Sequence, residues 1–424
     1  MTNITFDPRE HIRGIHQILI SDKKRIGFLF GAGSSFATGL ESVSIPTVAQ
    51  LTTLILEAVA AKGKAFASAV AEIKSEIGSA SFDIESLLST IEAKRAVIGA
   101  GKLNGLDSGG MSKLAAMVKE EVVKAVSIHD AIPLDQRKSL AHSNFSGWIE
   151  KARRRYPAEI FTTNYDYLFE MALEGLGIPY FDGFSGGFEP FFCPEAVEDI
   201  DAYTHLVKLW KMHGSLGWVY REHDKAVLRR QGAPAESILI YPSHLKYNTA
   251  KKQPYVGLID RLCTFLQQDD AILFTCGYAF GDNHINERIA TSLRRGANSH
   301  MVALYYDEVK DADNKSKFLL ADNDNKARLM AMHETAGKMS VYGLRHAVVG
   351  GRFGDWKLRD EPKTTEALQI GQYFDEDAAA PVEASGKGDE NWQGTGRFLL
   401  PDFRKLTEFL HELAPNTPYF DHKK

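Results

Sequence analysis

IGFLFGAG, at residues 26–33, joins a short apolar run to a glycine-rich turn. A run of this kind is typical of a strand that is buried on both faces of a parallel sheet. Gly31-Ala32-Gly33 follows it directly and indicates a tight turn at the end of that strand. We therefore expect a central buried strand whose carboxyl end opens into a loop.

Further runs of the same type lie downstream, with helical stretches between them, and this alternation predicts an α/β fold with a Rossmann-like, mostly parallel sheet. The runs are Glu159–Thr162, Val207–Met212, Ile238–Tyr241, Ala271–Cys276 and Met301–Tyr306. We expect one α/β domain over about residues 1–310. A C-terminal extension is expected over 311–424.

Between the first two runs the apolar spacing becomes helical, with a stripe formed by Val48, Leu51, Ile55 and Val59. We interpret about 47–150 as an inserted helical module. A segment rich in small and acidic residues, about 375–396, is typical of a linker or a long surface loop. An amphipathic terminal helix is expected after it, docked through Phe403, Leu406, Leu410 and Leu413.

Composition excludes several classes of protein. The chain has 424 residues, 44% of them hydrophobic, and 50 Lys+Arg against 55 Asp+Glu. A net charge of −5 gives no general attraction to nucleic acid or anionic membranes, and the short basic clusters do not favour direct nucleic-acid binding. We find neither a membrane span nor a signal sequence and expect a cytoplasmic protein. The cysteines Cys193, Cys263 and Cys276 contain no C-x-x-C pair, so no zinc or other metal site is predicted.

Four polar motifs follow strands, where open α/β sheets bind their ligands. They are Gly31–Ser35 (GAGSS), Thr162–Asp166 (TTNYD), His213-Gly214 and Thr275–Asn286 (TCGYAFGDNHIN). The first three have simpler explanations, which are an ordinary turn, a helix cap and a hydrogen-bonded structural histidine, in that order. A glycine loop also allows a pyrophosphate to approach backbone amides. Convergence of all four on one sheet edge favours a ligand site.

The order of these motifs resembles that of the sirtuin superfamily. GAGSS is similar to the sirtuin GAG-x-S loop, TTNYD to T-Q-N-x-D, and His213-Gly214 to the catalytic H-G pair. CGYAFGDNHIN and FDIESLL (Phe82–Leu88) are similar to segments of bacterial sirtuin-like proteins. The resemblance covers roughly Ile26 to Asp307.

The resemblance implies an NAD site. Asn164 and His213 would be the catalytic residues and would bracket the nicotinamide ribose. The remaining implied NAD-binding residues are Gly31, Ala32, Gly33, Ser34, Ser35, Thr163, Asp166, Gly277 and Asp282. Breaking the nicotinamide–ribose bond expels a neutral leaving group, so such a site needs a base near the ribose rather than a strong acid.

The sequence differs from sirtuin deacylases in ways that favour another branch of the superfamily. The two C-x-x-C pairs of sirtuin deacylases are absent, and Thr163 replaces the Gln beside the catalytic Asn. With its helical insertion, the chain resembles the sirtuin-like proteins of anti-phage defence, which hydrolyse NAD to nicotinamide and ADP-ribose and so deplete it. Among these it is most similar to the subunit that works with a HerA-type hexameric ATPase, which implies a homo-oligomer.

Two alternatives stay open, a zinc-free NAD-dependent protein deacylase and a non-catalytic NAD or ADP-ribose sensor that regulates a partner ATPase. The sequence does not give the trigger, the oligomer size, the use of NADP, or whether a partner is needed for activity. It also leaves the roles of Asp83, Glu85, Asp282 and His284 open between site and scaffold.

Overall fold

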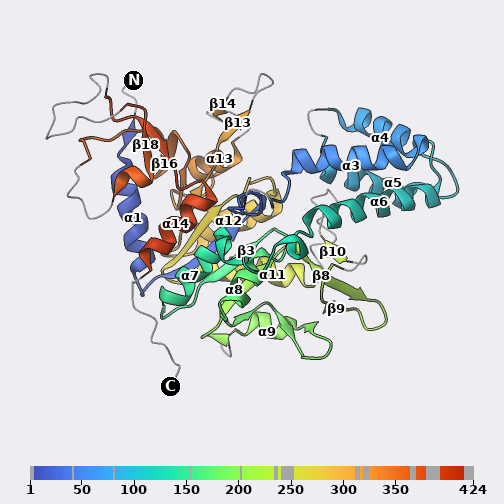
Figure 1. The fold of residues 1–424 in the computed structure, drawn as a ribbon, viewed down its shortest axis with the longest axis horizontal. Helices are drawn as coiled ribbons and strands as arrows, with labels where there is room; N and C mark the ends of the chain where they lie inside the picture. Colours follow the sequence, from blue (N-terminus) through green and yellow to red (C-terminus); the bar gives the residue numbers. More distant parts are fainter. Residues whose placement is uncertain are drawn as a thin grey trace.

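The structure is a computed structural model. It describes residues 4–40, 43–79, 82–152, 154–200, 203–233, 237–239, 253–310, 316–318, 325–362, 369–378 and 392–414. Within these ranges the fold is α/β, with one large sheet, a smaller antiparallel sheet and a projecting group of helices (Figure 1).

The large sheet contains ten strands among the described residues. Their order is β1 (Thr5–Phe6), β17 (Arg352–Trp356), β16 (His346–Val349), β15 (Met339–Tyr342), β12 (His300–Leu304), β11 (Ala271–Cys276), β2 (Arg25–Phe30), β3 (Glu159–Thr162), β7 (Val207–Lys211) and β4 (Tyr180–Phe181). Neighbouring strands from β15 to β4 are parallel. The chain moves from β2 to β3 on one side and from β11 to β12 on the other, so the strand order reverses between β2 and β11. Open α/β sheets bind their ligands at such a switch point.

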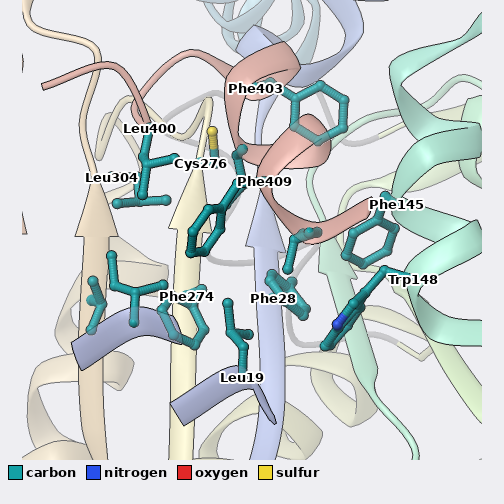
Figure 2. Close-up of a cluster of buried hydrophobic side chains, with 14 of the residues drawn as sticks. Leu19, Phe28, Phe145, Trp148, Phe274, Cys276, Leu304, Leu400, Phe403 and Phe409 are labelled. Atoms are coloured by element: carbon teal, nitrogen blue, oxygen red, sulfur yellow. The ribbon is translucent and has the colours of Figure 1, made fainter. Parts of the chain in front are cut away.

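Side chains alternate along β2 and bury both faces of the sheet. Ile26, Phe28 and Phe30 face one hydrophobic core (Figure 2), and Leu29 faces the other. The first core is covered by α1 (Pro8–Ile20), α7 (Ala141–Ala152), α8 (Leu168–Gly175) and α14 (Phe403–Leu413). The second is covered by α9 (Pro194–Glu198), α11 (Tyr255–Gln267), α12 (Asn283–Arg295) and α13 (Lys326–His333). Burial on both faces explains the nearly continuous apolar runs of the central strands.

A second sheet is antiparallel and continues directly from β7. Its order is β10 (Ser237–Leu239), β8 (Gly214–Arg221), β9 (Ala226–Arg229), β6 (Phe191–Phe192) and β5 (Phe184–Ser185). The run Ile238–Tyr241, interpreted as one more strand of the parallel type, contributes β10, which pairs antiparallel with β8. Residues 240–241 lie outside the described residues. A short apolar run does not identify its partner strand, which is why this part of the prediction was wrong.

Four helices form a module with a hydrophobic core of its own. They are α3 (Val48–Lys62), α4 (Lys64–Ile77), α5 (Ile84–Val97) and α6 (Ser108–Val126), and they project from the sheet (Figure 1). The separate core ends with α6. Although α7 also lies within 47–150, it returns to the sheet, where Phe145 meets Phe28 edge-on at 5.0 Å between ring centroids.

The C-terminal part docks on the sheet. Phe403, Leu406, Phe409 and Leu410 of α14 are buried in the first core. The segment 375–396, expected to be a linker, begins and ends in a hairpin of β18 (Phe374–Glu376) and β19 (Gly396–Phe398), while residues 379–391 lie outside the described residues. Shorter elements are β13 (Glu308–Lys310), β14 (Ser316–Phe318), η1 (His129–Ala131), η2 (Arg137–Ser139) and η4 (Ile370–Gln372). Within the described ranges, every helix is too short or too polar to cross a lipid bilayer.

Candidate functional site

The glycine loop lies at the switch point, against the loop that follows β11. It opens α2 (Ala32–Phe36), and the Gly33 amide donates to the Gly277 carbonyl at 3.0 Å. A Cβ atom on Gly31 would lie 2.6 Å from the Gly277 oxygen, and one on Gly33 would lie 2.6 Å from the Gly277 Cα. Gly277 itself has φ +66°. Side chains at these positions would force the two loops apart.

A phosphate site in the glycine loop would need free backbone amides, but three of the loop amides donate to carbonyl groups of the protein. Gly31 donates to the Cys276 carbonyl, Gly33 to that of Gly277, and Ser34 to that of Gly31. The first two amides bond to the end of β11 and the residue after it because the loop packs against them, and the Ser34 amide bonds within the loop itself. Ala32, by contrast, is exposed on the loop.

Asn164 joins the end of β3 to the glycine loop. Its side-chain amide donates to the Gly31 carbonyl at 3.0 Å, to Ser34 Oγ at 3.0 Å and to Ser35 Oγ at 2.7 Å. Asn164 and both serines are buried. The neighbouring Thr163 donates its amide to the Phe30 carbonyl at 3.1 Å, which fixes the chain beside the end of β2.

Asp166 contacts both the glycine loop and the start of α8. Its Oδ2 accepts from Ser35 Oγ at 2.6 Å, and its Oδ1 accepts from the amide of Leu168, the first residue of α8, at 3.0 Å. The N-cap position of α8 is Tyr167, which makes no side-chain cap, so Asp166 accepts the first amide of the helix from one position further upstream. Asn164 bonds to the glycine loop instead.

His213 lies between β7 and β8 and contacts Asp282. Its Nε2 is 3.0 Å from Asp282 Oδ2, and the two side chains are 9% and 8% exposed. Gly214 has φ +94°, a conformation that glycine adopts readily, and this permits the turn between β7 and β8. Asp282 also caps α12, because its Oδ1 accepts from the amides of His284 and Ile285 at 3.1 and 3.3 Å.

The loop between Gly277 and Asp282 is braced from α12. Tyr278 Oη donates to Asn286 Oδ1 at 3.1 Å, and Asn286 Nδ2 donates to the Phe280 carbonyl at 2.8 Å. Burial raises the pKa of the Tyr278 hydroxyl well above its ordinary value, so Tyr278 is a neutral donor. Phe280 has φ +56°, a costly conformation for a bulky residue, and these contacts hold it there.

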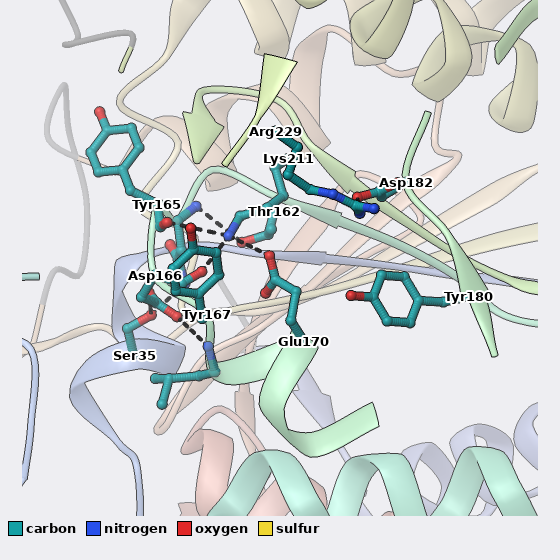
Figure 3. Close-up of polar contacts among 12 residues, drawn as sticks. Ser35, Thr162, Tyr165, Asp166, Tyr167, Glu170, Tyr180, Asp182, Lys211 and Arg229 are labelled. Carbon is teal, nitrogen blue, oxygen red and sulfur yellow. Dashed lines mark hydrogen bonds and ion pairs between the residues drawn. The ribbon is translucent and has the colours of Figure 1, made fainter. Parts of the chain in front are cut away.

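The motifs gave no indication of a buried ion pair, Lys211 with Glu170, that lies beside residues 165 and 166 (Figure 3). Lys211, at the end of β7, donates to Glu170 Oε1 at 2.7 Å, to the Tyr165 carbonyl at 3.2 Å and to the Asp166 carbonyl. Burial is the largest influence on Glu170 and raises its pKa, against the opposing effect of Lys211. The available signal was that the buried run VKLWK contains two lysines, of which Lys211 is the last residue.

The predicted residues thus form two groups, and the loop from Gly277 to Asp282 contributes a residue to each. One contains the glycine loop with Asn164 and Asp166, and the other contains His213 and Asp282. Asp83 belongs to neither group, since it caps α5 in the helical module by accepting from the Ser86 amide at 2.7 Å. The side chain of Glu85 lies outside the described residues.

Comparison with known protein families gives a match to part of the chain. Residues 158–327 match the family model described as a SIR2-like domain, and no curated protein matches the chain. A crystal structure of a Sir2 homologue in complex with NAD is 14% identical, covers 69% of this chain and 83% of its own, and has a TM-score of 0.33. A structure concerning the mechanism and regulation of Sir2 enzymes is 14% identical over 70% of this chain and 86% of its own, with a TM-score of 0.32.

The matched range includes β3, β7 and β11 with the polar residues at their carboxyl ends. The glycine loop after β2 precedes it in the sequence but contacts it through Asn164 and Gly277. The residues that match the SIR2-like domain model include Asn164, His213 and Asp282.

Proposed function

We propose that the protein hydrolyses NAD at the nicotinamide–ribose bond and releases nicotinamide and ADP-ribose. The observation that carries this proposal is the arrangement at the switch point of the sheet. Asn164 follows β3, and its side-chain amide bonds to the glycine loop after β2. His213 follows β7, the strand on the other side of β3, and contacts the carboxylate of Asp282. The SIR2-like match over 158–327 supports NAD as the substrate.

The chemistry suits these residue types. Nicotinamide leaves as a neutral molecule with the electron pair of the C–N bond, and water adds to the positively charged ribose carbon. The attacking water must then lose a proton, which His213 is suited to accept near neutral pH. Asn164 provides an amide to orient a ribose hydroxyl or the water. We assign His213 as the base and Asn164 as the orienting residue.

Substrate binding in this proposal requires an exchange of hydrogen bonds. Ser34, Ser35, Asn164 and Asp166 bond to one another and are buried. A pyrophosphate over Gly31–Ser35 would take over the serine hydroxyls and the exposed side of Ala32. Asp166 would then be released toward the carboxamide of nicotinamide, with Thr163 beside the ribose and Gly277 near the adenosine. This closed network equally suits a sensor that stays inactive until triggered.

The test is product release from NAD by the purified protein, followed by chromatography of nicotinamide and ADP-ribose. His213→Ala and Asn164→Ala are each expected to abolish release while keeping the far-UV circular dichroism of the wild type. Binding of NAD is measured on the same samples by calorimetry, which separates loss of chemistry from loss of binding.

The alternatives give different results in the same experiment. Tight NAD or ADP-ribose binding without product release would replace the hydrolase with the sensor. Formation of O-acetyl-ADP-ribose from an acetylated peptide would favour the deacylase. NADP is tested as a parallel substrate.

We also propose, from the sequence resemblance alone, that the activity depletes NAD during anti-phage defence. The proposed assembly is a homo-oligomer working with a HerA-type ATPase. The assay above is therefore repeated with the co-expressed ATPase, and a mass measurement of the purified sample determines the oligomer. Release that depends on the ATPase would identify the partner as the activator.

A further inference from the structure

We propose that Asp282 is a positioning residue that fixes the tautomer of His213, in place of the NAD contact that the sequence suggested for it. The inference deepens the proposed hydrolase function and rests on it. It concerns which imidazole nitrogen of neutral His213 carries the proton, and it starts from the contact between His213 Nε2 and Asp282 Oδ2 at 3.0 Å.

The two oxygens of Asp282 have separate roles. Oδ1 accepts the amides of His284 and Ile285 at the start of α12, and Oδ2 faces His213. The backbone of a 13-residue helix thereby fixes the carboxylate in space. The positive end of the helix dipole also stabilises its negative charge. The imidazole therefore meets a carboxylate that two backbone amides hold in a fixed position.

An ionised carboxylate only accepts hydrogen bonds, so the nitrogen that faces it must carry a proton. The neutral His213 is then protonated at Nε2, and its lone pair is at Nδ1. Nδ1 is therefore the nitrogen that accepts the proton of the attacking water. Once it has done so, the imidazolium keeps its Nε2–H bond to Asp282, which stabilises the new charge without taking the proton.

Burial strengthens this coupling. Both side chains are less than one-tenth exposed, so little water competes for the hydrogen bond between them. The turn at Gly214 and the cap of α12 hold the two partners on different elements, β7–β8 and β11–α12. The pair therefore also joins the two loops that flank the central strands.

The test compares two substitutions that retain the helix cap. In Asp282→Asn the side-chain oxygen still accepts the α12 amides, but the other atom becomes an NH₂ donor. This donor forces His213 Nε2 to accept and moves the ring proton to Nδ1. In Asp282→Ser the hydroxyl still caps the helix but is too short to reach the ring, so His213 is released without being forced into the wrong tautomer. Asp107→Asn is the matched control, because Asp107 caps α6 in the helical module by accepting from the Gly110 amide.

We expect Asp282→Asn to lower kcat by about 10²–10⁴-fold with KM changed less than about threefold, the range seen when a base is lost or held in the wrong tautomer. Asp282→Ser is expected to lower kcat less than Asp282→Asn does, and Asp107→Asn to leave it unchanged. If Asp282 had only a structural role, kcat would fall more in Asp282→Ser than in Asp282→Asn, because Asn preserves the shape of Asp better than Ser does. Equal kcat for Asp282→Asn and the wild type would overturn the proposal.

A second readout does not depend on activity. Protein labelled with ¹⁵N-histidine reports the protonated ring nitrogen of His213 by NMR, with the signal assigned from its loss in His213→Gln. The wild type is expected to carry the proton on Nε2 and Asp282→Asn on Nδ1. The same tautomer in both proteins would overturn the inference. A wild type that releases no nicotinamide but shows these tautomers would refute the hydrolase and keep the positioning role.

Discussion

Lys211 is a buried residue that donates hydrogen bonds to the backbone directly after Asn164. Its side chain is 3% exposed, and its ammonium bonds to the carbonyls of residues 165 and 166 and to Glu170. A buried charge that loses its partner is costly, whereas replacing both partners with apolar residues is often neutral. Lys211 therefore combines two effects, a charge balance with Glu170 and a donor for the loop carbonyls.

A double variant can distinguish the charge balance with Glu170 from the hydrogen bonds to the loop carbonyls. Lys211→Met is expected to lower the free energy of unfolding by about 3–5 kcal/mol, because it leaves Glu170 buried and uncompensated. Adding Glu170→Leu should restore most of that stability but not NAD turnover, because the loop carbonyls still lack their donor. Urea unfolding and nicotinamide release are measured on both variants. Recovery of turnover in the double variant would show that Lys211 acts through charge alone.

His142 predicts a pH dependence of stability. It is completely buried on α7 between Phe169 and Phe403, and burial lowers its pKa from 6.5 to about 4. Between those values the unfolded chain binds the proton and the folded protein does not. The stability is therefore complete above about pH 6.5 and is lost as the pH falls toward 4. The full loss is about 3 kcal/mol, at about 1.4 kcal/mol for each pKa unit.

Urea unfolding at pH 7.5 and 5.5 checks this dependence. His142→Phe, which keeps a ring among the aromatic neighbours, is expected to lose about 1 kcal/mol less than the wild type between those pH values. His223→Gln serves as the control, because that ring is 75% exposed. An equal loss in the wild type and His142→Phe would assign the pH dependence to other groups.

At the scale of elements, β3 and α11 are joined by a buried ion pair at the amino end of the strand. Arg261 donates to both oxygens of Glu159, at 2.7 and 3.0 Å, and Trp210 Nε1 donates to Oε2 at 2.9 Å. The pair lies at the opposite end of β3 from Asn164. It should therefore affect the stability of the fold without touching the site.

Glu159→Gln is accordingly expected to lower the free energy of unfolding by about 3–5 kcal/mol, since Arg261 stays buried without a counter-charge. The KM for NAD should not change. The exposed pair of Arg288 and Asp260 provides the control, and Arg288→Met is expected to cost less than about 1 kcal/mol. A changed KM in folded Glu159→Gln would mean that the two ends of β3 are coupled.

The sequence predicted elements whose signal is local. The runs at β2, β3 and β11 are apolar because both faces of the sheet are covered, and their boundaries agree with the structure to within a residue. The antiparallel pairing of β10 with β8 was not predictable from β10 itself, because a strand's partner is set by the rest of the fold. The same applies to the antiparallel edge formed by β16 and β17.

The candidate site also contains contacts that the sequence predicted and contacts that it did not. Asn164 was expected near the glycine loop because parallel strands end at one edge, and the structure places it there. The contact of His213 with Asp282 spans 69 positions of sequence and has no local signature. Motif spacing also gave no indication that the loop amides bond to the Cys276 and Gly277 carbonyls, since that depends on how closely two loops approach.

At the scale of the whole molecule, the helical module and the sheet have separate hydrophobic cores. A small cluster connects them, in which Val126 at the end of α6 lies with Leu168 at the start of α8. Leu168 is also the residue whose amide donates to Asp166. The base of the module therefore lies against the element that begins at the candidate site, while the cores of α3 to α6 and of the sheet share no buried residues.

This division predicts that the module opens as a unit of its own. Leu114→Ala, in the fully buried centre of α6, is expected to cost about 2–5 kcal/mol and to speed amide hydrogen exchange throughout α3 to α6. The amides of β2 and β11 should keep their wild-type exchange rates, because their core contains none of the affected side chains. Leu406→Ala on α14, buried in the sheet core, should give the opposite pattern. Faster exchange in β2 with Leu114→Ala would instead mean that the cluster at Val126 and Leu168 makes the two cores a single cooperative unit.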